Sequence, residues 1–263
     1  MSRRFFNTIQ AYRTAVHTAV VVHIDATSWR EAGQRRWLQA ATTNQVTSFR
    51  ITTGRGRAGL DTLLPATFDG IVGSDRWNAY TRYPAVQRQL CWAHLTRNLR
   101  ALAEGGMRDS PWARDLLPPV ESMFIAWHTF RDGATTRAGV QTAMQPIQST
   151  IRTALEDGRP RPWDNITAFS QEVLTWRDAL WTVVTHPGVA PTNNAAERML
   201  RPSVIWRKQG FGTQSADGSR FVERILSVVT TCRQQGRNVW NLLTDAVRAS
   251  MTGHPAPTLL PTP

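Results

Sequence analysis

The sequence has little cysteine and no long apolar run. Its two cysteines, Cys91 and Cys232, cannot make a disulfide framework and indicate a reducing compartment. No stretch of about 18 consecutive apolar residues occurs, which argues against a transmembrane helix. The first ten residues contain arginine but no apolar segment of the kind found in signal peptides. These absences predict a cytoplasmic protein without a membrane partner.

Lysine is nearly absent as well, because Lys208 is the only one among 31 basic residues. With 19 acidic residues, the formal net charge is +12. The net charge is +9 over residues 1–100, −2 over residues 101–190 and +5 over residues 191–263. A genome rich in G and C explains arginine in place of lysine, but it does not explain the nearly neutral middle block. Since a basic field attracts polyanions, the two flanking blocks are expected to face nucleic acid.

The hydrophobic pattern of the first hundred residues predicts an α/β fold. Strands are expected at residues 19–27, 36–43, 46–53 and 70–75, the second and third joined by a hairpin turn. A short helix is expected at Leu60–Leu64. Residues 90–103 begin as a strand and continue with the apolar spacing of a helix.

The remainder of the chain predicts helices. They are expected at residues 120–130, 140–155 and 166–184, with Pro118-Pro119 as a break, and at residues 194–202, 219–233 and 238–250. The helix at 219–233 is expected to bury Phe221, Ile225 and Cys232. The Pro-rich end after Gly253 is expected to be disordered.

Three acidic residues are candidates for the chemistry. Asp25 and Asp75 are each expected at the end of an apolar strand, and Glu197 in the first turn of a helix. Three neighbouring carboxylates repel one another unless a cation neutralises them, and Mg²⁺ prefers oxygen ligands. The alternatives are structural: an aspartate after a strand often begins a turn, and Asn194 with Glu197 matches a capping box.

Other residues give weaker signals. Cys91 and His94 form a C-x-x-H pair, but a zinc site would need a second pair that the sequence does not show. His23 shares a strand face with Asp25 and is either a site residue or a packed core residue. Five tryptophans lie near these motifs and are expected mainly in the core, although they could stack on bases: Trp29, Trp37, Trp77, Trp92 and Trp206.

Long segments of the chain resemble the transposases of the insertion-sequence 66 family. The segments are residues 22–51, 70–100 and 191–247, a little under half of the chain. They contain SDRWNAY (74–80), QRQLCWAHLTRNLR (87–100), TNNAAERMLRPSVIWRKQGFGTQSADGSRFVE (192–223) and TCRQQGRNVW (231–240). The family pattern DETGW reads Asp25-Ala26-Thr27-Ser28-Trp29 here, so Ala26 and Ser28 replace an acid and a glycine.

The resemblance implies a ribonuclease H-like mixed sheet with flanking helices, interrupted by an all-helical insertion. The implied segments are an atypical leader (1–20), the first part of the core (21–103), the insertion (104–190), the rest of the core (191–250) and a Pro-rich tail (251–263). Because family members are longer at the N-terminus, the chain is expected to be a truncated copy.

The same resemblance implies a DDE transposase that cleaves and joins DNA strands. Asp25, Asp75 and Glu197 would hold two Mg²⁺ or Mn²⁺ ions, and Cys91 and His94 would support the site. Residues expected to contact phosphate are Arg198, Arg201, Arg207 and Lys208. For Arg201 and Arg207 the alternative is a structural ion pair. The implied partners are transposon ends and target DNA, in an oligomer in the nucleoid, with accessory proteins of the same element. The alternatives are an inactive DNA-binding copy and a ribonuclease H-like nuclease.

Overall fold

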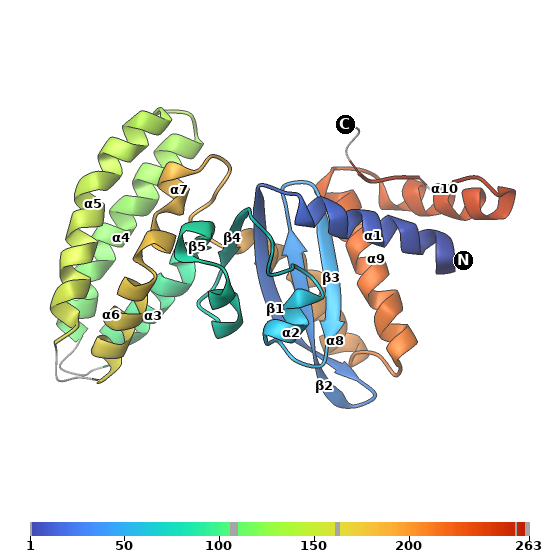
Figure 1. Ribbon diagram of the computed structural model, residues 1–263, viewed down its shortest axis with the longest axis horizontal. Coiled ribbons are helices and arrows are strands. Elements are labelled where there is room, and N and C mark those ends of the chain that lie inside the picture. The colour runs from blue at the N-terminus through green and yellow to red at the C-terminus, as the bar shows by residue number, and fades with distance from the viewer. Residues whose placement is uncertain (1, 106–109, 161–163, 256, 261–263) are drawn as a thin grey trace. The chain divides into compact units, whose positions relative to one another are not determined.

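The computed structural model describes residues 2–105, 110–160, 164–255 and 257–260. The chain forms two compact units. We call Met1–Pro84 together with Asn193–Pro263 the sheet unit, and Ala85–Thr192 the helical unit. Figure 1 shows both units, and each is described by itself below. No helix in the described ranges is both long and apolar enough to cross a membrane.

The sheet unit is built on a mixed β-sheet, which confirms the predicted α/β class. Strands β1 (Val21–Glu31), β2 (Gln34–Thr42) and β3 (Thr47–Thr52) are consecutive antiparallel neighbours. Strand β4 (Ile71–Ser74) pairs in parallel with β1 on the other side. All four strands lie close to the positions that the hydrophobic pattern predicts.

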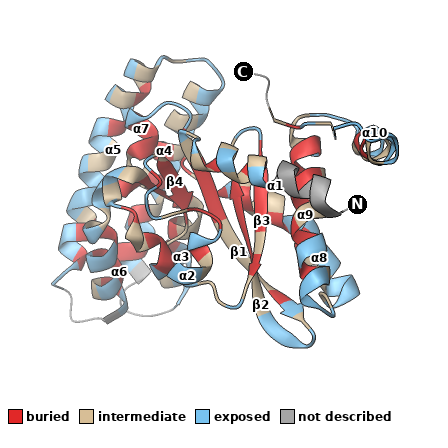
Figure 2. Cartoon of the chain, turned by 45° about the vertical axis from the view of Figure 1, so that its right-hand side comes forward, coloured by how far each residue is buried: buried red, intermediate tan, exposed pale blue. Residues whose placement is uncertain are grey.

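Helices cover both faces of this sheet. On one face, α1 (Ser2–His17) and α2 (Arg57–Asp61) belong to a core cluster that includes Tyr12, Ile24 and Leu60. On the other face, α8 (Asn194–Gly210) packs on Trp29. Helix α9 (Ala216–Gln234) lies along β3 and contributes residues to the clusters on both faces. Helix α10 (Val239–Thr252) contributes Leu242 to the first cluster, and the 3₁₀ helix η1 (Asn78–Arg82) follows β4. Figure 2 shows the strands as mostly buried.

Polar side chains of α9 serve strand β3 as a neighbouring strand would. Glu223, Ser227 and Thr231 follow one another at intervals of four residues on the helix face. Their oxygens accept hydrogen bonds from the backbone N–H groups of Ile51 (2.8 Å), Phe49 (3.0 Å) and Thr47 (3.0 Å), respectively. Exposed strand edges invite pairing with other chains, and this helix satisfies the edge instead. Figure 1 shows α9 running beside β3.

The helical unit begins with the 3₁₀ helix η2 (Ala85–Gln87) and the short strand β5 (Arg88–Leu90). Its helices are α3 (Trp92–Glu104), α4 (Ser110–Arg131), α5 (Arg137–Gly158), α6 (Asp164–Thr175), the 3₁₀ helix η3 (Arg177–Leu180) and α7 (Thr182–Thr185). The sequential pairs α3–α4, α4–α5 and α5–α6 pack on each other.

Several predicted boundaries are wrong. Helix α2 begins at Arg57 rather than Leu60, and the expected helix at 166–184 is three separate pieces. Pro118 and Pro119 lie inside α4 rather than between helices. Helix α8 likewise continues past Pro202 to Gly210.

Both terminal segments contribute residues to the core, although the Pro-rich tail was predicted to be disordered. The expected leader forms α1, whose Tyr12 and Val16 are buried in the core. Near the C-terminus, Leu259 is 1% exposed and its carbonyl accepts a hydrogen bond from Gln235 (2.6 Å), so this part of the tail is docked. In α9 the buried apolar residues include Val222, Leu226 and, as predicted, Cys232, whereas Phe221, predicted to be buried, is 59% exposed.

Candidate active site

Asp25 lies in the middle of β1, not at its end as predicted. The strand continues for six residues beyond it as one arm of the β1–β2 hairpin. Side chains alternate along a strand, so Asp25 shares a face with Trp29, which packs against Leu200 of α8. Asp25 therefore faces the layer that contains the α8 helix.

The register of β1 and β4 places Asp75 beside Asp25. The strands are parallel and His23 is opposite Gly73, so each aspartate comes two residues beyond that pair. A Cβ atom at Gly73 would lie 2.4 Å from Nδ1 of His23, so only glycine leaves room for the imidazole. Asp75 directly follows β4, as predicted, and its Oδ1 accepts a hydrogen bond from the N–H of Trp77 (2.8 Å).

Glu197 lies in the first turn of α8, and Asn193 ties this helix to β1. The Asn193 amide donates to the carbonyl of Ile24 (2.8 Å), and its Oδ1 lies 3.3 Å from Nδ1 of His23. The predicted capping box is wrong, because the helix cap is Asn193 rather than Asn194 and its side chain does not cap the helix. That side chain fixes the start of α8 against the strand that carries Asp25.

The electrostatics of Asp25 link the three acids. Burial raises the pKa of Asp25 to about 7; the N–H of Ala26 (2.7 Å) opposes this shift, and the charges of Asp75 and Glu197 add to it. Arg55 acts in the opposite direction and lowers the pKa of Asp25. Coulombic interactions weaken with distance, so these contributions indicate that the groups lie near one another. The sheet unit thus brings the three predicted carboxylates into one electrostatic neighbourhood.

His23 is a buried residue next to this site. Its side chain is 8% exposed, and burial lowers the pKa of the imidazole. The neutral form therefore predominates near pH 7. Both readings of the sequence apply, since the ring is packed in the core and also positions Asn193 at the start of α8.

The predicted phosphate contacts differ in their surroundings. Arg198, Arg201 and Lys208 are exposed on α8. Arg207 is half-buried and donates to the carbonyl (2.6 Å) and hydroxyl oxygens of Ser28. Its guanidinium therefore serves the structure of the unit, as the alternative interpretation of the sequence allowed.

Cys91 and His94 lie in the helical unit. Cys91 precedes α3, its thiol is buried, and its carbonyl accepts the N–H of His94 (3.1 Å). Cys232 is also a free, buried thiol, and it lies 3.3 Å from the carbonyl of Arg237. The supporting role of Cys91 and His94 stays a prediction.

Sequence reasoning named Trp77 but missed Arg55, whose guanidinium packs on it near the acids. The Arg55 guanidinium lies 3.4 Å from the centre of the Trp77 ring, and the indole N–H of Trp77 donates to the Arg55 carbonyl (3.0 Å). Trp29 and Trp92 are buried as expected, whereas Trp77 and Trp206 are 38% and 36% exposed. The basic, glycine-rich stretch 54–59 was the available signal.

Comparison with known proteins shows the family of the chain. Residues 2–220 match the family described as "Transposase IS66 family". The chain belongs to this family. The match includes all three carboxylates, the whole helical unit and the whole of α8.

Relatives of this IS66 family chain include two uncharacterized proteins of Sinorhizobium fredii (strain NBRC 101917 / NGR234). The protein y4qI is 25% identical over 232 residues, which cover 82% of this chain and 42% of the relative. The protein y4jO is 35% identical over 69 residues, which cover 26% of this chain and 22% of the relative. The chain thus spans less than half the length of these relatives.

Proposed function

We propose that the sheet unit is the catalytic core of a DDE transposase, which cuts DNA strands and joins them to a target. Family membership supports the class of activity. The observation that supports the mechanism is the parallel register of β1 and β4, which brings Asp75 beside Asp25, together with the Asn193–Ile24 hydrogen bond that ties the helix of Glu197 to β1. The raised pKa of Asp25 agrees with this arrangement. Asp25, Asp75 and Glu197 are the catalytic residues in this proposal, and DNA is the partner.

The three carboxylates fit divalent cations. Burial and mutual repulsion both disfavour the charged form of Asp25, and a cation held between the acids would remove that penalty. All three side chains offer oxygen ligands, which Mg²⁺ and Mn²⁺ prefer. When bound, two such ions would lower the pKa of the attacking hydroxyl and stabilise charge on the phosphate.

The residues of the chain supply position and charge. Asp25 and Asp75 would hold the cations that bind the reacting phosphate near the end of β4, and Asn193 keeps Glu197 near them through its hydrogen bond to Ile24. Water attacks the phosphodiester, a new P–O bond forms, and the bond to the 3′-oxygen breaks to release a 3′-OH. That 3′-OH then attacks a target phosphodiester and releases the 3′-OH of the target strand. The exposed Arg198 and Arg201 contact backbone phosphates.

The test compares the full chain with Asp75→Asn on two substrates. Nicking is measured on supercoiled plasmid, and joining on plasmid mixed with a labelled oligonucleotide that ends in 3′-OH, each with Mg²⁺ or Mn²⁺. Loss of one metal ligand is expected to reduce nicking by more than about 100-fold, since even outer-shell partners cost 10–100-fold. Asp217→Asn, an exposed acid in the first turn of α9, is the matched control and is expected to keep full activity.

The outcomes separate the alternatives. Equal nicking by Asp75→Asn and the unaltered chain would refute the assignment of Asp25, Asp75 and Glu197 as the catalytic residues. Metal-dependent nicking without joining would favour a nuclease on the same framework. DNA binding without nicking in the unaltered chain would favour a copy that only binds DNA.

A further inference from the structure

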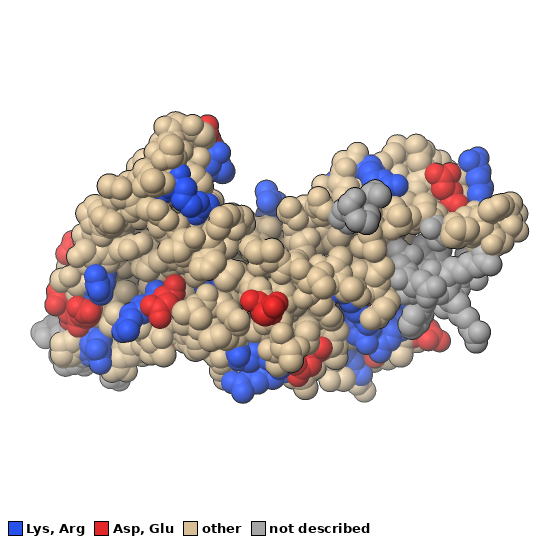
Figure 3. Space-filling view, turned by 45° about the horizontal axis from the view of Figure 1, so that its top comes forward, with Lys and Arg blue, Asp and Glu red and all other residues tan. Residues whose placement is uncertain are grey.

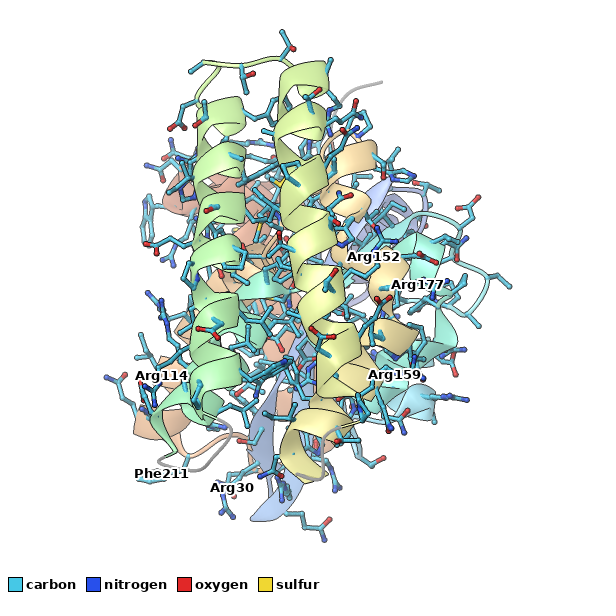
Figure 4. The ribbon with its side chains drawn as sticks, turned by 90° about the vertical axis from the view of Figure 1, so that its left-hand side faces the viewer. Arg30, Arg114, Arg152, Arg159, Arg177 and Phe211 are labelled. Atoms are coloured by element: carbon cyan, nitrogen blue, oxygen red, sulfur yellow. The ribbon has the colours of Figure 1, made fainter. Side chains whose placement is uncertain are left out.

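A pocket of about 460 Å³ in the sheet unit is strongly basic. Its lining residues come from the β1–β2 hairpin and the end of α8: Ser28, Arg30, Arg35, Arg207, Lys208 and Phe211. Four of the six are cationic and none is acidic. Arg30, Arg35 and Lys208 make no ion pair with any described carboxylate. Figure 4 labels Arg30 and Phe211, which lie near each other at this pocket.

The backbone holds the Phe211 ring out in solvent. Phe211 is 74% exposed and has a left-handed backbone (φ 58°), which few non-glycine residues adopt. A Cβ atom at Gly212 would lie 2.2 Å from the Arg30 carbonyl, so the chain approaches β1 closely here. Thr213 exchanges backbone hydrogen bonds with Arg30 (2.9 Å) and Ala32 (2.8 Å). Phe211 is the C-cap of α8, and the contacts of Gly212 and Thr213 with β1 hold this turn while the apolar ring stays accessible to solvent.

A stack of arginine and tryptophan side chains connects this pocket to the candidate active site. Trp37 has two guanidinium groups at 4.9 Å from its ring centre, those of Arg35 and Arg55. Arg55 in turn lies over the ring of Trp77. Arg35 also lines the pocket, and the N–H of Trp77 is bonded to Asp75. We call Trp77, Arg55, Trp37 and Arg35, together with the pocket, the basic track.

The chemistry of the basic track matches an unpaired nucleic acid strand. Guanidinium groups bind phosphates and also stack on base faces, and an exposed aromatic ring stacks on bases of any sequence. Duplex DNA offers phosphates but keeps its base faces stacked inside the helix. An acidic peptide offers carboxylates but has no need of an exposed ring beside them. Stacking on Trp37 holds Arg35 and Arg55 in place, which lowers the entropic cost of binding.

We propose that the basic track binds an unpaired DNA strand that leads away from the carboxylates, with phosphates on the arginines and a base stacked on Phe211. The identity of the strand as DNA rests on the proposed function, whereas the preference for unpaired over duplex nucleic acid does not. Ser28 belongs to the pocket, because its hydrogen bonds hold Arg207 against the hairpin.

The test measures binding without catalysis. The full chain is titrated in EDTA against a fluorescent 20-nucleotide oligo-dT strand and a fluorescent 20-base-pair duplex, and anisotropy gives each Kd. Phe211→Gly removes the ring and suits the left-handed turn, and Phe211→Tyr keeps a stacking ring. Phe211→Gly is expected to weaken binding of the single strand about 5-fold to 100-fold, with less than about a twofold change for the duplex. Phe211→Tyr is expected to retain the affinity.

Two further variants test the position and the charge of the basic track. Trp240→Ala removes an equally exposed ring, 77% accessible, from α10, which lies away from the β1–β2 turn in Figure 1, and should leave both Kd values unchanged. Arg35→Gln is expected to reduce the salt dependence of single-strand binding by about 0.7 in the slope of log K against log salt.

Some results would overturn the proposal. These are an equal loss for duplex and single strand in Phe211→Gly, no loss for either, or displacement of the oligonucleotide by poly-glutamate at the same charge concentration. Because binding is measured in EDTA, its outcome does not depend on a metal ion held by the carboxylates. A failed nicking assay would therefore not contradict the binding role of the basic track. A failed binding assay would not contradict the catalytic role of Asp25, Asp75 and Glu197.

Discussion

The two units of the chain differ in charge more than in size. The sheet unit contains 20 basic and 9 acidic residues, and the helical unit contains 11 and 10. The pockets differ in the same way. The pocket of the sheet unit has only cationic charges, whereas that of the helical unit, about 190 Å³, combines Arg152 and Arg177 with Asp178 and apolar side chains. Figure 3 shows both signs of charge interspersed on the visible face of the helical unit.

Arginine side chains in the two units have different surroundings. In the helical unit, Arg137 donates to the carbonyls of Val183 and Val184 (both 3.1 Å), so its charge stabilises a helix end. In the sheet unit, Arg35 and Arg55 stack on Trp37 and form no ion pair with a described carboxylate. The net charge of the whole chain is therefore a poorer guide to function than where the unpaired cations gather.

The largest expected effect concerns Glu223, the buried acid of the sheet unit. It is 3% exposed and accepts hydrogen bonds from Ile51, Arg50 (3.0 Å) and Arg220 (2.9 Å). Glu223→Ala leaves two guanidinium groups and one edge N–H without this acceptor, and it should lower the free energy of unfolding by about 3–5 kcal/mol. Urea unfolding measures the loss, and hydrogen exchange at residues 47–52 locates it.

Asp178→Ala is the control in the helical unit. Asp178 is 60% exposed and lies 3.8 Å from Arg177, so its removal should change stability by less than about 0.5 kcal/mol. A comparable loss from both variants, or faster exchange confined to the helical unit in Glu223→Ala, would contradict the structural role of the edge contact.

The strands were predictable because alternation and β-branched composition are local properties. Helix α8 shows where local rules fail: Pro202 was expected to end it, yet the helix continues. Arg198 and Pro202 are both exposed, so water can satisfy the carbonyl that proline cannot bond. In α9, apolar spacing selected Phe221, but the buried face is decided by polar contacts with the β3 edge.

The candidate site was predictable in its residues but not in its surroundings. Asp75 and Glu197 occupy the places that strand and helix signals gave them, whereas the continuation of β1 beyond Asp25 depends on pairing with β2. The basic track joins residues near positions 30, 55 and 77 to others near position 210. No pattern within one segment contains that proximity, because tertiary folding creates it.

The next largest effect concerns Asp25 and the pH dependence of the free energy of unfolding. Its pKa lies near 7 in the folded chain and near 3.8 when unfolded, so the folded state binds the proton more tightly. Stability attributable to this group is fully present below pH 3.8 and is lost as the pH rises toward 7. Asp25→Asn should remove that loss and stabilise the chain at pH 8 by up to about 4 kcal/mol in EDTA.

The measurement is the unfolding midpoint between pH 4 and pH 8, with and without Mg²⁺. Mg²⁺ should raise the midpoint of the unaltered chain at pH 8 and have less effect on Asp25→Asn, because the carboxylate would be a ligand. The exposed acid Asp132 of the helical unit gives the comparison, and Asp132→Asn should leave the pH profile unchanged. Identical pH profiles for Asp25→Asn and the unaltered chain would show that the pKa of Asp25 is not raised in the folded state.

The smallest expected effect tests whether the helical unit shares in DNA binding. Arg152→Gln and Arg177→Gln each remove a cation from its pocket, where Asp178 already offsets part of the charge. Phosphate contacts set the salt slope of DNA binding, so variants outside the contact surface should leave that slope and the Kd within about twofold. A slope lowered by about 1 in either variant would mean that DNA also contacts the helical unit. DNA binding would then extend beyond the unit that carries the carboxylates. The charge difference between the units would then reflect how strongly each binds DNA, and not which of them binds it.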